Sequence, residues 1–129
     1  MSRLVALLLL LPALASAERR AALLVGESAG EGADVPLKYA LTDVDRVRDV
    51  LVEVGGVPAD AIVSLRGATA STLREALREL QYKIDREAWG PSDRLYVYVS
   101  SHARDGELRL AGTRFPVAVN EVACGVRWS

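Results

Sequence analysis

The chain has 129 residues, of which 26% are charged and 50% are hydrophobic, and its formal net charge at pH 7 is −1. This length and composition predict a single globular domain. The nearly balanced charge gives no electrostatic reason to expect a nucleic acid as a partner.

Residues 1–17 have the features of a secretory signal peptide. Arg3 supplies a positive start, residues 4–15 form an apolar run, and the Ala-Ser-Ala of residues 15–17 suits cleavage. The alternative is a membrane anchor, but the run is shorter than the ~20 residues that a spanning helix needs, and Pro12 interrupts it. We therefore expect export to the periplasm or the cell exterior, with no membrane contact after cleavage.

Three short apolar runs predict strands at residues 21–25, 61–65 and 95–99. The third run, Leu-Tyr-Val-Tyr-Val, is apolar throughout and rich in strand-forming residues, so we expect it inside a sheet. After it, residues 104–116 alternate apolar and polar side chains around Asp105-Gly106 and Ala111-Gly112. This alternation is typical of a small hairpin.

Two helices are expected between these strands. The first is capped by Thr42 and ends at the glycine pair 55–56, and the second is capped by Thr69 or Ser71 and stops at Gly90-Pro91. Their apolar stripes comprise Val44, Val47, Leu51 and Val54 in the first helix, and Leu73, Leu77, Leu80 and Ile84 in the second. Strand and helix alternation at this spacing predicts an α/β fold of three layers, a mainly parallel sheet flanked by helices.

Ligands of such sheets bind beyond the carboxyl ends of the strands, where His102, the only histidine, falls. His102 is either a catalytic base or a hydrogen-bonded structural residue. Ser101 cannot be its nucleophile, because neighbours on an extended chain point to opposite faces. The glycine-containing loop at residues 26–32 lacks the spacing of a nucleotide-binding motif and is better explained as a flexible connection.

Metal and disulfide chemistry have few candidate residues. One histidine and one cysteine cannot complete a usual metal ligand set, so we expect neither a metal nor another cofactor. Cys124, the only cysteine, has no internal disulfide partner, and in an oxidising compartment it is free, bonded to another molecule, or functional.

A family resemblance rests on four sequence features: Val25-Gly26 at the end of the first strand, Leu-x-Tyr-Ala-x-x-Asp at residues 37–43, the helix from Thr69, and the strand leading to Ser101-His102. With them, residues 19–115 resemble the N-terminal half of the bacterial caspase-like cysteine peptidases, relatives of caspases and metacaspases. The resemblance implies a partial caspase-like domain at residues 18–115. It also implies endopeptidase activity on peptide or protein substrates through a Cys–His dyad, with His102 as the general base.

The family nucleophile lies at the end of a fourth strand, in a motif such as Asp-Ala-Cys. Val-Ala-Cys-Gly at residues 122–125 partly resembles it, which makes Cys124 a candidate nucleophile. However, Cys124 follows His102 by only 124 − 102 = 22 residues, against about 50 in caspases. The alternative is that residues 116–129 are a tail that does not match the family, as a truncated or frame-shifted gene would produce. The dyad would then be incomplete.

The family's strand order, 2-1-3-4, gives this alternative a structural consequence. Without a fourth strand, residues 95–99 would form an unpaired sheet edge. The chain would then be a non-catalytic caspase-like fragment that acts as a protein-interaction module. Such a chain should aggregate, self-associate through residues 95–99, or pair this edge with another protein.

Overall fold

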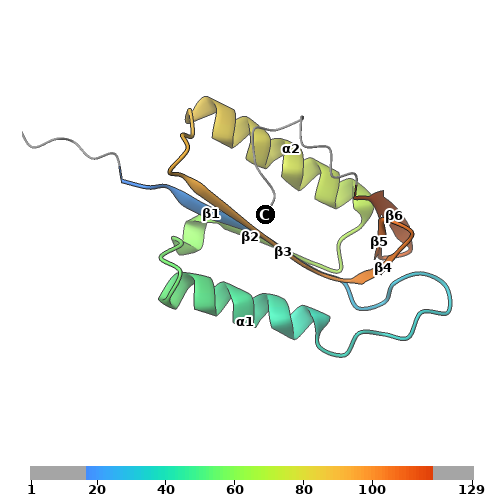
Figure 1. Ribbon diagram of the computed structural model, residues 1–129. Coiled ribbons are helices and arrows are strands. Elements are labelled where there is room, and N and C mark those ends of the chain that lie inside the picture. The colour runs from blue at the N-terminus through green and yellow to red at the C-terminus, as the bar shows by residue number, and fades with distance from the viewer. Residues whose placement is uncertain (1–16, 118–129) are drawn as a thin grey trace, which may run out of the picture.

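The computed structural model describes residues 17–117, and a three-stranded parallel sheet forms its centre (Figure 1). In chain order, its elements are β1 (Arg20–Gly26), α1 (Ala40–Glu53), a short 3-10 helix (Ala59–Ala61), β2 (Ile62–Arg66), α2 (Ala70–Arg86) and β3 (Arg94–Ser100). The two helices lie on opposite faces of the sheet (Figure 1). The predicted α/β class is therefore confirmed. No helix among the described residues is both long and apolar enough to cross a membrane.

The sheet order is β2-β1-β3, so β1 is the central strand. Residues 21–26 of β1 are all buried, because α1 covers one side of this apolar run and α2 covers the other. Alternate residues of β1 therefore enter two cores. Ala22 and Leu24 pack with Val44 between the sheet and α1, and Leu23 and Val25 pack with Leu73 between the sheet and α2.

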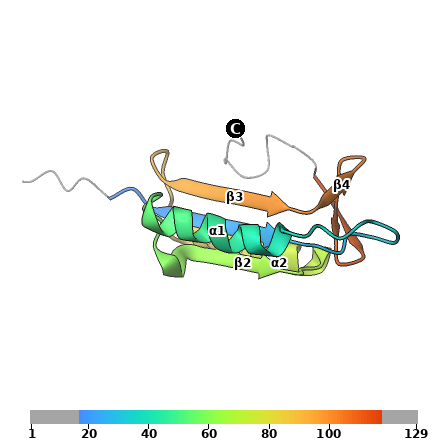
Figure 2. The same cartoon turned by 90° about the horizontal axis from the view of Figure 1, so that it is seen from below.

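The position of β3 differs from what its apolar run predicts. Within residues 17–117, β3 pairs with β1 alone and is an edge strand, so the expectation of an interior strand is wrong for this part of the chain. Figure 2 shows β3 at one edge of the sheet, to one side of α1, with β2 at the opposite edge. Its tyrosines, Tyr96 and Tyr98, pack against the α1 core, whereas Val97 and Val99 remain 36% exposed.

The helix starts test the capping predictions. The α1 helix begins at Ala40 with Tyr39 at its N-cap and no side-chain cap, so the prediction of Thr42 as the cap is wrong and Thr42 lies inside the helix. Of the two alternatives for α2, Thr69 is the cap: its side chain accepts a hydrogen bond from the backbone N–H of Thr72. The α2 helix ends at Arg86, ahead of the expected Gly90-Pro91 stop.

A second, antiparallel sheet follows β3 and consists of β4 (His102–Arg104), β5 (Glu107–Leu110) and β6 (Thr113–Pro116). Both of its turns have positive φ at their two central residues, 54° and 73° at Asp105-Gly106 and 44° and 75° at Ala111-Gly112. Such turns match the twist of antiparallel strands. The hairpin prediction is confirmed and extended, because His102 begins a third strand of this small sheet.

Candidate functional site

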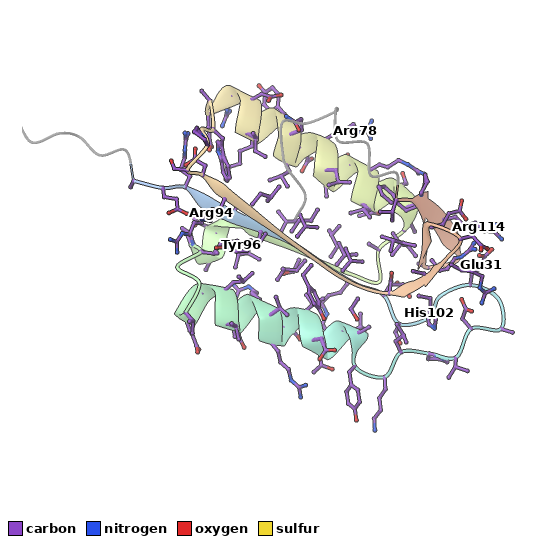
Figure 3. All side chains as sticks on the ribbon, in the orientation of Figure 1. Glu31, Arg78, Arg94, Tyr96, His102 and Arg114 are labelled. Atoms are coloured by element: carbon purple, nitrogen blue, oxygen red, sulfur yellow. The ribbon has the colours of Figure 1, made fainter. Side chains whose placement is uncertain are left out.

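The carboxyl ends of the three parallel strands meet beside the small antiparallel sheet. There, the backbone N–H of Glu27 donates to the carbonyl of Ser100 (2.9 Å), and that of Gly67 donates to the carbonyl of Gly26 (2.8 Å). His102 follows β3 after one residue, Ser101, and lies at this end of the molecule, as do Glu31 and Arg114 (Figure 3). The prediction that His102 lies beyond the carboxyl ends of the parallel strands is confirmed, and the loop after β1 lies at the same end.

The imidazole of His102 is held by the loop of residues 27–39, which connects β1 to α1. Its Nε2 lies 2.8 Å from the carbonyl oxygen of Val35. A carbonyl oxygen only accepts hydrogen bonds, so in the neutral imidazole Nε2 must carry the proton. The other nitrogen, Nδ1, then holds a lone pair and is the nitrogen able to accept a proton.

The backbone of Gly30 covers this second nitrogen. Nδ1 is buried and has no hydrogen-bond partner among the residues that the structure describes. A Cβ at Gly30 would lie 2.6 Å from Nδ1 and 2.7 Å from Oδ2 of Asp34, and the φ of Gly30 is +67°. Both the space and the backbone conformation therefore require glycine here.

Asp34 shapes the turn in which Gly30 lies. Its Oδ2 accepts a hydrogen bond from the backbone N–H of Glu31 (2.9 Å), and its Oδ1 lies 3.3 Å from Nη2 of Arg104. The pKa of Asp34 lies below its usual value, mainly because of the hydrogen bond from Glu31, with a smaller contribution from the charge of Arg104. The carboxylate is therefore ionised next to the imidazole at neutral pH.

The small antiparallel sheet presents one polar row toward this loop. His102 pairs with Arg109 across β4 and β5, and Arg109 pairs with Arg114 across β5 and β6. Directly opposed residues of antiparallel strands share a face, so the three side chains form one row. The opposite face packs against the core below α2 and carries Leu108, Leu110 and Phe115.

Glu31 joins this row to the loop. Its carboxylate accepts from Nη1 of Arg109 (2.7 Å) and from Nε and Nη2 of Arg114 (3.0 and 2.9 Å). The hydrogen bonds from Arg114 are the main reason that the pKa of Glu31 is lowered, and the same pair raises the pKa of Arg114. The side chain of Arg109 is only 7% exposed, so Glu31 balances a buried positive charge.

Sequence reasoning found His102 but missed the residues that hold it. Val35 contributes a backbone carbonyl, which no side-chain pattern reveals. The signal for Arg109 and Arg114 was present, because the alternation in residues 104–116 places both on the polar face of the hairpin. Glu31 lies in the loop at residues 26–32, whose sequence indicated only a flexible connection.

The remaining candidate residues are Ser101 and Cys124. The Ser101 hydroxyl donates to the carbonyl of His102 (3.1 Å) and makes no hydrogen bond to the imidazole. Cys124, with residues 118–129 of the expected tail, lies outside the described residues, and so do residues 1–16 of the expected signal peptide. Within the described part of the chain, no group of three His, Cys, Asp or Glu side chains gathers as metal ligands would.

Comparison with known proteins adds no family to these observations: no protein-family model, curated protein or solved structure matches the chain.

Proposed function

We propose that residues 18–115 are part of a caspase-like cysteine peptidase domain, with His102 as the general base of a Cys–His dyad. The observation that carries the proposal is the state of the imidazole. It lies at the carboxyl edge of a parallel sheet, and its Nε2 proton is donated to the carbonyl of Val35. Nδ1 therefore has the free lone pair that a general base needs.

In the proposed reaction, the thiol of Cys124 loses its proton to Nδ1 of His102. The thiolate attacks the carbonyl carbon of a peptide bond, and backbone N–H groups stabilise the oxyanion. The proton on Nδ1 then passes to the departing amine, and water hydrolyses the acyl-enzyme. In the described conformation Gly30 covers Nδ1, so this reaction requires the turn at residues 29–34 to move aside.

A thiol-reactive peptide electrophile tests the dyad in the full chain. General-base assistance is worth about 100-fold or more, so His102→Ala should slow labelling of Cys124 by at least that factor. Ser101→Ala is the matched control, because its hydroxyl contacts only the backbone of His102. Slow labelling of the unmodified chain that His102→Ala leaves unchanged would show that no dyad exists.

The second candidate is a non-catalytic caspase-like fragment that pairs the β3 edge with another protein, here a second copy. β3 is seven residues long, and Val97 and Val99 are exposed on it. Antiparallel pairing of two β3 strands about Val97 would set Tyr96 opposite Tyr98 and Leu95 opposite Val99 of the second copy. These are apolar and aromatic pairs of the kind that stabilise sheets.

Solution size tests this second candidate. A charge on an edge strand opposes strand addition, so Val97→Lys should weaken self-association, measured by sedimentation. Val50→Lys is the control, since Val50 is exposed on α1, away from the edge. A chain that is already monomeric at micromolar concentration would rule out this self-pairing.

A further inference from the structure

One acidic side chain connects the polar row of the small antiparallel sheet with the loop that encloses His102. Glu31 lies in the turn next to Gly30 and contacts both Arg109 of β5 and Arg114 of β6. Arg109 is the cross-strand neighbour of His102. The imidazole and the Glu31 carboxylate are therefore attached to the same two elements, the loop and the small sheet.

The loop has few other attachments to this sheet among the described residues. The N–H of Gly112 donates to the carbonyl of Gly30 (3.1 Å), and Arg104 contacts Asp34 (3.3 Å). The side chain of Arg104 is exposed, whereas that of Arg109 is buried. Exposed ion pairs contribute little to stability, so the Arg104–Asp34 contact holds the loop only weakly. We therefore expect the charged hydrogen bonds of Glu31 to be the main attachment of the loop to the small sheet.

We infer that Glu31 is the positioning residue for His102. Through Arg109 and Arg114 it holds the loop whose Val35 carbonyl fixes the proton on Nε2 and whose Gly30 excludes water from Nδ1. The catalytic role of this positioning rests on the proposed function, because only a general base needs one particular ring nitrogen to be unprotonated. The state of the imidazole itself does not depend on peptidase activity.

The single histidine makes this state directly measurable. In the full chain labelled with ¹⁵N, NMR correlations of the neutral imidazole should show Nε2 protonated and Nδ1 bare, with slow exchange of the Nε2 proton with water. Glu31→Gln keeps the size of the side chain and removes its charge. We expect this variant to speed exchange of the Nε2 proton by at least 10-fold and to mix the two tautomers.

The matched control is Glu79→Gln. The side chain of Glu79 is exposed on α2 and makes no hydrogen bond or ion pair with other side chains of the described range. This control should keep the exchange rate of the unmodified chain. If Glu31→Gln fails to fold, Arg114→Gln removes the exposed partner and leaves the Glu31–Arg109 pair; it should speed exchange by a smaller factor, with circular dichroism confirming the fold.

The outcomes separate this inference from the proposed dyad. A folded Glu31→Gln variant with unchanged tautomer and exchange rate would overturn the positioning role, and so would an equal effect of Glu79→Gln. An unreactive Cys124 would refute the dyad and leave the NMR result in place. A changed imidazole in Glu31→Gln, together with a His102-dependent thiol, would support both.

Discussion

Replacing Gly30 by alanine should damage the site more than the same change at Gly32. The two glycines have nearly equal φ values, +67° and +62°. Alanine at such a φ costs ~1–2 kcal/mol, partly offset by ~0.4–1 kcal/mol from the lower entropy of the unfolded chain. Gly32→Ala adds nothing more, because no atom lies within 4 Å of its Cβ. We therefore expect Gly32→Ala to lower the free energy of unfolding by about 1 kcal/mol.

Gly30→Ala carries the same backbone cost and a steric one. Its Cβ would lie 2.6 Å from Nδ1 of His102, so the imidazole must turn away. This rotation of the His102 ring breaks the hydrogen bond to Val35, which costs about 1 kcal/mol. It also forces the side chain into an unfavourable rotamer, which costs about 0.5–1.5 kcal/mol. Gly30→Ala should thus lower the free energy of unfolding by about 2 kcal/mol more than Gly32→Ala.

Urea unfolding followed by circular dichroism measures this difference, and the NMR signal of the single imidazole reports whether the ring has moved. Equal stabilities of the two variants would refute the close contact between Gly30 and His102. An unmoved imidazole in Gly30→Ala would refute it independently, because a Cβ and the present ring position cannot coexist.

Three further variants or conditions test the core, the helix cap and the charged cluster. Leu24→Ala, at a fully buried position of β1, should cost about 3 kcal/mol in urea unfolding, and a cost below 1 kcal/mol would contradict its place in the core. Thr69→Ala should cost about 1 kcal/mol, whereas Ser71→Ala should cost almost nothing; equal effects would reject Thr69 as the cap. The folded pKa values of Glu31 and Asp34 are lowered, so their stabilisation is present above the usual carboxyl pKa of about 4 and is lost as the pH falls below it. Glu31→Gln should flatten this acid dependence of the unfolding free energy, and an unchanged pH profile would contradict the pairing.

Local signals in the sequence predicted those elements whose cause is itself local. The apolar runs predicted all three parallel strands to within a residue at each end. The cap of α2 was narrowed to Thr69 or Ser71, and the turns at residues 105–106 and 111–112 were identified, because capping and tight turns depend largely on local residue types. Thr42 misled for the same reason: a hydroxyl before an apolar stripe is typical of a cap, but the helix extends back to Ala40, which is buried against β1 by tertiary packing.

The sequence by itself determined the α/β class, the position of His102 after the third strand and the polar face of the small sheet. All three follow from the order and period of apolar residues, which local geometry converts into strands and helices. Only the tertiary structure decided between an interior and an edge position of β3 within residues 17–117, and showed that His102 donates to Val35 while Gly30 covers its other nitrogen. These contacts join residues 67 and more positions apart, and the loop that makes them has no periodic pattern that could reveal its path.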